Sequence, residues 1–137
     1  MAGRCGSPRR LAWKRFGRTE QHGLNIFFRA TSVRLEESGT FSLSERDQWG
    51  QRIVILARFT HLPTGRGFFH FNSHWCVCSE QDLLGSARTA AEQFALRSQA
   101  TLPLIFTGDL NVFSNTDRSK AIRYLTGEEV DGTRTPE

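Results

Sequence analysis

Residues 103–111 read PLIFTGDLN, where an apolar run stops abruptly at polar residues. Residues 104–106 have the β-branched and aromatic bias of a buried strand, and Gly108 then permits a tight backbone conformation. Asp109 and Asn111 follow, and positions two apart in an extended segment point to the same side. A carboxylate and a carboxamide on the same side of the chain suit the binding of a hard cation or a phosphate. Both residues are also common in turns, so the rest of the chain must decide between a site and a turn.

The composition limits the size of the protein and the kind of partner that it suits. A chain of 137 residues is the length of one domain, and its 11 Phe residues add to an apolar fraction of 38%. Lys and Arg number 18 against 14 Asp and Glu, which gives a net charge of +4. Only two of the 18 are Lys, and the planar guanidinium of Arg matches phosphate oxygens. The charge therefore favours an anionic partner without identifying it.

Three cysteines and the N-terminal segment bear on the cellular compartment. Cys5, Cys76 and Cys78 are odd in number, and Cys-Val-Cys is closer than the usual spacing of zinc ligands. This pattern favours reduced thiols in a cytoplasmic protein, with neither a disulfide framework nor a zinc site. No stretch approaches the roughly 18 apolar residues of a membrane span. Residues 1–15 lack the apolar centre of a secretory signal, and we expect them to form a disordered basic tail.

The periodicity of apolar residues predicts a mixed α/β layer. Strands are predicted at 24–29, 32–36, 40–43, 53–59, 68–74 and 102–107, and helices at 80–100 and 119–125 with Ser119 as a candidate cap. A polar loop is predicted at 45–52, and strands 53–59 and 68–74 form the clearest hairpin.

A second polar pair ends the strand 68–74, where Asn72 and His74 stand two residues apart. The helix at 80–100 links this strand to 102–107, and a β-α-β unit makes the two strands parallel. Their carboxyl ends then meet at one edge of the sheet, where ligands of such sheets usually bind. We therefore expect His74 to lie beside Asp109 and Asn111 at this edge rather than in the core.

Taken together, these segments resemble the endonuclease/exonuclease/phosphatase superfamily, the deoxyribonuclease I-like hydrolases. The matching segments are FFHFNSH (68–74), an arginine in the following helix (Arg88), PLIFTGDLN (103–111) and SKAIRYL (119–125), with SGTFSLSE (38–45), Trp49 and RIVILARF (52–59) upstream. The resemblance covers residues 16–126.

This resemblance implies a four-layer α/β sandwich, with two mixed β-sheets flanked by helices. It also implies hydrolysis of phosphodiester or phosphomonoester bonds with Mg²⁺ or Mn²⁺. Asp109 and Asn111 match the acidic and amide pair that orients water and contacts the metal or the phosphate. His74 matches the strand-end histidine that contacts the scissile phosphate or assists the leaving group. Glu20 matches the glutamate that binds the metal together with Asp109 and Asn111, and the two residues after Glu20 are alternatives for that position.

The same resemblance implies residues that this chain lacks. The family carries an asparagine motif and a second acidic residue on its first strand, and it ends on Ser-Asp-His, whose histidine is the main acid and base. Such sandwiches need about 200–250 residues. We therefore expect residues 16–126 to be a partial domain, truncated at both ends and impaired in activity. Residues 127–137 are expected to be a polar tail without core residues.

Three functional hypotheses remain open at this point. The chain is a metal-dependent phosphoesterase, a non-catalytic remnant that keeps an anion site, or a small basic nucleic-acid-binding domain. The Phe doublets at 27–28 and 68–69 lie within apolar strands, as expected of a core rather than of an exposed RNA-binding sheet. A phosphate ester is the expected substrate. Nucleic acid, inositol phosphate and sphingomyelin enzymes share these motifs, and the sequence does not predict the oligomeric state.

Overall fold

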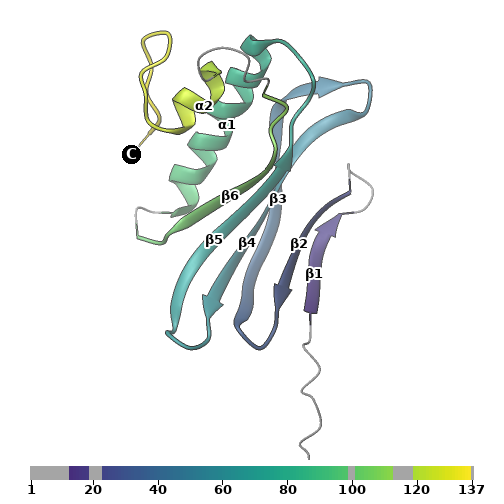
Figure 1. Cartoon of the computed structure of the whole chain (residues 1–137), viewed down its shortest axis with the longest axis vertical. Coiled ribbons are helices and arrows are strands. Elements are labelled where there is room, and N and C mark those ends of the chain that lie inside the picture. Colours follow the sequence, from purple (N-terminus) through teal and green to yellow (C-terminus); the bar gives the residue numbers. More distant parts are fainter. Residues whose placement is uncertain (1–12, 19–22, 99–100, 113–118, 137) are drawn as a thin grey trace, which may run out of the picture.

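The computed structural model describes residues 13–18, 23–98, 101–112 and 119–136. Its elements follow in the order β1 (Trp13–Arg18), β2 (Leu24–Arg29), β3 (Val33–Asp47), β4 (Gly50–His61), β5 (Arg66–His74), α1 (Glu80–Ser98), β6 (Leu104–Asp109) and α2 (Lys120–Leu125) (Figure 1).

Four of the strands form one mixed sheet in the order β3-β4-β5-β6. Strands β3, β4 and β5 are antiparallel neighbours, whereas β5 and β6 are parallel. Helix α1 makes the connection between these two parallel strands, as the sequence predicted. The predicted hairpin of β4 and β5 is also confirmed, and β1 pairs with β2 in a separate antiparallel ribbon.

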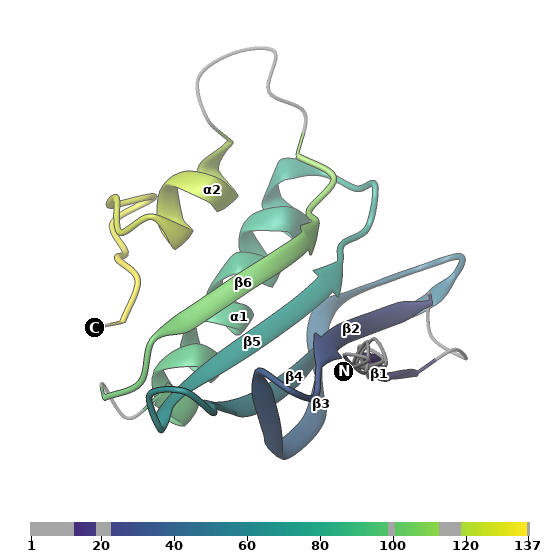
Figure 2. The same cartoon turned by 60° about the horizontal axis from the view of Figure 1, so that its bottom comes forward.

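The four-stranded sheet is covered on both faces, by different elements (Figure 2). Helices α1 and α2 pack on one face over an apolar cluster that includes Leu56, Phe71 and Leu84. Strand β2 lies on the other face, where Ile26 and Phe28 join a second cluster with residues of β4. The described residues therefore form a mixed α/β fold of a ribbon, a sheet and a layer of helices.

Local sequence explains where α1 begins. The N–H of Asp82 donates to the Ser79 hydroxyl (3.2 Å), and that hydroxyl donates to the Asp82 carboxylate (2.6 Å). This reciprocal cap occupies one of the backbone donors that the first turn of a helix leaves unpaired. Leu84, Ala87 and Ala91 then recur at helical spacing and lie buried against the sheet.

Several boundaries differ from the sequence-based expectation. Residues 45–52 are not a polar loop, because β3 runs on to Asp47 and β4 already begins at Gly50. The strands expected at 32–36 and 40–43 are one long strand, because residues 37–39, which had suggested a break, pair in register with β4 after a shift between Leu35 and Glu37. At the N-terminal side, Trp13–Arg18 is strand β1, part of which had been expected to be disordered.

The ends of the core also differ from expectation. Val130 is buried in the cluster beneath the helices, so the prediction that residues 127–137 contribute no core residue is wrong. A backbone bridge between Val130 and Thr133 folds this segment back, and the Tyr124 hydroxyl donates to the Arg134 carbonyl (3.1 Å). Phe27 is exposed although its neighbour Phe28 is buried, since adjacent residues of a strand face opposite sides.

The Cys76 and Cys78 side chains lie against each other in the segment between β5 and α1. The chain turns at Val77 and brings the two Cα atoms within 5.4 Å, a separation that a disulfide can bridge, and the reduced thiols expected from the sequence stay a prediction.

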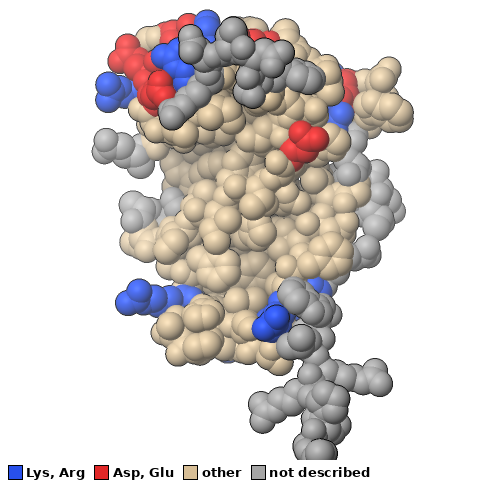
Figure 3. Space-filling view, viewed as in Figure 1, with Lys and Arg blue, Asp and Glu red and all other residues tan. Residues whose placement is uncertain are grey.

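None of the described helices is both long and apolar enough to cross a membrane. The face seen in Figure 3 is largely free of charged side chains across its middle, and most of the Lys, Arg, Asp and Glu residues on it gather toward its ends.

Candidate functional site at the carboxyl ends of β5 and β6

The structure brings together the polar residues that end the two parallel strands. His74 is the register partner of Asp109, and the His74 Nε2 atom lies 3.9 Å from Asp109 Oδ2. The His74 side chain is 39% exposed and that of Asp109 is 67% exposed, so a ligand in solvent can reach both groups. The prediction that His74 lies at the sheet edge and not in the core is confirmed.

Asn111 holds the chain that follows β6 against this edge. Its backbone has a positive φ of 49°, and its N–H donates to Asp109 Oδ1 (3.0 Å). Its side-chain amide donates to the Trp75 carbonyl (2.7 Å), and the Trp75 N–H donates to the Asp109 carbonyl (2.9 Å). The turn interpretation and the site interpretation are therefore compatible: Asp109 forms the turn through one carboxylate oxygen and still presents its carboxylate to solvent.

Side chains further back along β5 tie the site to its surroundings. Asn72 donates to the Asn25 carbonyl of β2 (3.1 Å), which joins the ribbon to the sheet. His70 Nε2 lies 2.9 Å from the Thr107 hydroxyl, and burial lowers the pKa of this imidazole. Both Asn72 and His70 thus have structural partners.

Arg52 and Asp47 form a supporting pair that sequence reasoning missed. The Arg52 side chain is almost fully buried, with its Nε and Nη2 atoms 3.0 and 2.5 Å from Asp47 Oδ2. Its Nη1 atom donates to the His74 carbonyl (3.3 Å), so the pair fixes the backbone of the site histidine. Both residues lie within the segment 45–52 that the sequence predicted to be a polar loop, which gave no reason to pair them.

A divalent cation fits the donor chemistry at this edge in part. Asp109 supplies a carboxylate and Asn111 an amide oxygen, and Mg²⁺ binds one or two carboxylates while it keeps several waters. Among the described residues, no group of three or more His, Cys, Asp or Glu could hold a metal ion. Glu20, the other predicted metal ligand, and the alternatives Gln21 and His22 lie outside the described residues.

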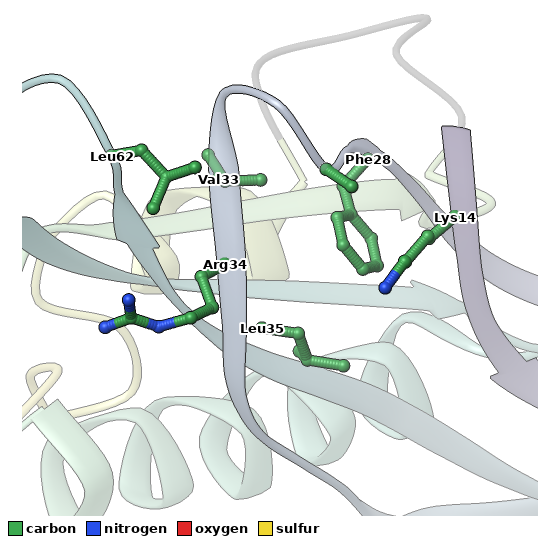
Figure 4. A pocket seen from close by; sticks show the side chains of 7 residues that line it. Lys14, Phe28, Val33, Arg34, Leu35 and Leu62 are labelled. Atoms are coloured by element: carbon green, nitrogen blue, oxygen red, sulfur yellow. The ribbon is translucent and has the colours of Figure 1, made fainter. Parts of the chain in front are cut away.

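A pocket of about 360 Å³ lies apart from this site (Figure 4). It is lined by apolar side chains such as Phe28, Leu35 and Leu62, with Lys14 and Arg34 at its rim. Residues 61 and 66 pair beside it at the start of β5, so the pocket lies toward the opposite end of the strand from His74.

Known protein structures share the fold of this chain, although sequence comparisons found no match. No protein-family model matches the chain, and no curated protein matches its sequence. Among solved structures, an endonuclease/exonuclease/phosphatase family protein from Bacteroides thetaiotaomicron is 26% identical with a TM-score of 0.68, covering 80% of this chain and 46% of that one. The mannosyl-6-phosphatase of the same organism is 27% identical with a TM-score of 0.68 and the same coverages.

A more distant structure, TDP2 of D. rerio complexed with a single-strand DNA product, is 18% identical with a TM-score of 0.59. It covers 86% of this chain and 44% of that one, and at this identity the likeness shows a shared fold alone. The chain thus spans a little under half the length of these structures. Both Bacteroides proteins share its fold and about a quarter of its residues over four fifths of its length, so this chain has the fold of part of an endonuclease/exonuclease/phosphatase family protein.

Proposed function

We propose that this chain carries the centre of a metal-dependent phosphoesterase, with His74, Asp109 and Asn111 as its catalytic residues. The observation that supports the proposal most is the pairing of an exposed imidazole with an exposed carboxylate at the carboxyl ends of two parallel strands. Open α/β sheets bind ligands at such ends.

The proposed residues divide the work of hydrolysis among them. Water forms a bond to phosphorus, the ester P–O bond breaks, and the departing oxygen leaves with a proton. Asp109 accepts a hydrogen bond from the attacking water and orients it. His74 donates a hydrogen bond to the phosphate or a proton to the departing oxygen. Asn111 keeps the Asp109 carboxylate in place through its backbone N–H.

Glu20, Asp109 and Asn111 are the proposed ligands of Mg²⁺ or Mn²⁺. When bound, the ion neutralises charge on the phosphate oxygens and makes a coordinated water more acidic. Oxygen donors of this kind are those that hard cations prefer, and the excess of basic over acidic residues suits an anionic substrate.

We propose a phosphate ester as the substrate and no narrower class. One similar structure is named a mannosyl-6-phosphatase and another holds a single-strand DNA product, so sugar phosphates and nucleic acid are both candidates. We expect turnover by the 137-residue chain to be slight. An upstream asparagine and a C-terminal histidine, which the family resemblance implies, have no counterpart within these residues, and general acid–base catalysis alone contributes about 10²–10⁴-fold.

The test is hydrolysis of bis-p-nitrophenyl phosphate and of plasmid DNA with Mg²⁺, together with calorimetry of Mg²⁺ binding. Asp109→Asn should abolish the residual turnover and weaken Mg²⁺ binding at least tenfold, since the amide keeps the turn but loses the charge. Asp131→Asn is the matched control, because Asp131 is an exposed carboxylate paired with Lys120 far along the chain.

Binding of Mg²⁺ without turnover would favour the non-catalytic remnant. Equal Mg²⁺ affinity in both variants would contradict the metal site, and robust turnover by the unaltered chain would contradict the expected impairment.

A further inference from the structure

We propose that the pocket between the β1–β2 ribbon and β3 binds a small amphiphilic anion, a carboxylate with an unbranched aliphatic tail, and that Lys14 recognises the carboxylate. The pocket measures about 360 Å³, toward the lower end of the volumes of small-ligand sites. We call it the ribbon pocket, and its lining includes Lys14, Phe28, Val33, Arg34, Leu35 and Leu62 (Figure 4). It lies apart from the candidate phosphoesterase site, so this inference does not rest on the proposed function.

Lys14 lies on the face of the ribbon that turns toward the four-stranded sheet. It is the register partner of Phe28, and directly opposed residues of two antiparallel strands lie on the same face. Phe28 is buried and packs on Phe59 of β4 with ring centroids 5.0 Å apart, so this face is the inner one. Figure 4 shows the Lys14 ammonium beside the Phe28 ring. Because the Lys14 side chain is still exposed, a ligand from solvent can reach its charge at the edge of an apolar surface.

The charge of Lys14 is not matched by a carboxylate. Within the described parts of the chain, no ion pair includes Lys14, and none of the described residues that line the ribbon pocket is acidic. Arg34 is instead paired with Glu36, with 2.8 Å between Nε and Oε1, and its side chain lies on the other side of β3 (Figure 4). An ammonium group has three N–H donors and no acceptor, so an anionic head group is the partner that Lys14 suits best.

The rest of the lining suits an aliphatic tail. Val33 and Leu35 stand two apart on β3, so they share a face, and both pack against the apolar cluster that contains Phe28. Leu62 follows β4, and its N–H donates to the Ser32 carbonyl (2.9 Å), which ties it to the turn that precedes Val33. Leu62 is nevertheless 42% exposed. A tail in the ribbon pocket would remove this aliphatic surface from water, while its carboxylate stays beside Lys14.

The test is titration of the full chain with octanoate, hexanoate and uncharged 1-octanol, followed by calorimetry and by NMR, below the concentration at which octanoate forms micelles. We expect octanoate to bind about fifteenfold more tightly than hexanoate, since each of its two additional buried methylenes contributes about fourfold. Lys14→Gln should weaken octanoate binding about threefold to fivefold and leave the affinity for 1-octanol unchanged, whereas Lys14→Arg should keep the affinity for octanoate. Octanoate should shift the NMR signals of Val33 and Leu62 and leave those of His74 in place.

Lys120→Gln is the matched control, because Lys120 is the other lysine of the chain and lies on α2, outside the ribbon pocket. It should leave octanoate binding unchanged. Equal losses in Lys14→Gln and Lys120→Gln, or an equal loss of octanoate and 1-octanol binding in Lys14→Gln, would overturn the role of Lys14. Octanoate that shifts the signals of His74 but not those of Val33 and Leu62 would overturn the ribbon pocket as its site. Binding to vesicles of anionic phospholipid without binding of octanoate would also overturn the proposal, since it would show a membrane-binding surface instead.

Discussion

Gly108 directly precedes Asp109 in β6, at a point where the two parallel strands β5 and β6 lie very close together. Its φ is 146°, and a Cβ atom on it would lie 1.9 Å from the carbonyl oxygen of Ser73. Such a contact is shorter than any real one, and the atom that it meets belongs to the backbone. Glycine is therefore required for Asp109 to lie level with His74 at the edge of the sheet.

We predict that Gly108→Ala destabilises the protein by more than about 4 kcal/mol, because β6 must move away from β5 or the strand end must unfold. Gly127→Ala is the control, since Gly127 also has a positive φ of 87° but has no atom within 4 Å of the place that a Cβ would occupy. It should cost only about 1 kcal/mol, the strain of a left-handed residue. Urea denaturation of both variants measures the difference, and equal losses would show that conformation rather than contact requires Gly108.

The sequence was sufficient to predict which residues meet at this edge but not what supports them. His74 and Asp109 could be paired because alternation along a strand and a helical crossover are local patterns. Arg52 and Asp47 could not be paired, since their contact depends on a hairpin register that the polar residues between them concealed. Glu20 remains a prediction, as it lies outside the described residues.

At the scale of elements, Glu45 shows how tightly β3 packs on α1. Its carboxylate is buried and accepts a hydrogen bond from the Ser44 hydroxyl (2.5 Å), while its other oxygen has no hydrogen-bond partner. A Cβ added to Gly85 of α1 would meet the same carboxylate at 3.3 Å. Burial raises the pKa of Glu45 above its ordinary value of 4.5, because the charged form loses its hydration.

We predict that this burial makes the protein less stable as the pH rises. Between 4.5 and the raised pKa of Glu45, the folded state binds more protons than the unfolded state, so the free energy of unfolding falls with increasing pH. Glu45→Gln removes this term, and its stability relative to the unaltered protein should increase through that window and then level off at neutral pH. Thermal denaturation from pH 4 to pH 8 measures it. Glu92→Gln, an exposed carboxylate of α1, should show no such gain. A Glu45→Gln variant that is less stable at pH 7 would contradict the prediction.

Elements with one clear period were predicted well, and those with mixed signals were not. Helix α1 and strands β2, β5 and β6 have continuous apolar patterns, and the structure agrees with them to within a few residues. The tip of the β3–β4 hairpin is polar because it projects into solvent. Its sequence therefore lacks the alternation of apolar residues that predicts a strand. The packing of Val130 was equally hidden, since one apolar residue among polar neighbours carries no period.

At the scale of the whole molecule, the four-stranded sheet ends in exposed edges. Within the described residues, β6 pairs with β5 on one side and with no strand on the other. The chain spans 46% of the length of the two Bacteroides structures that it resembles. Ile105 of β6 is 48% exposed, in addition to the free backbone groups of the edge. Unpaired apolar strand edges are templates on which another strand can pair.

We therefore predict that the 137-residue chain associates at high concentration through the β6 edge. Ile105→Lys should shift this association to a concentration at least tenfold higher, because a charge on an edge strand opposes pairing with a second copy. Leu96→Lys introduces the same charge at an exposed apolar residue of α1, away from any strand edge, and should change the association little. Sedimentation equilibrium of the three proteins over a range of concentrations decides the matter. Equal effects of the two substitutions would attribute the association to net charge or general apolar exposure, and a chain that stays monomeric throughout would show that the β6 edge does not pair in solution.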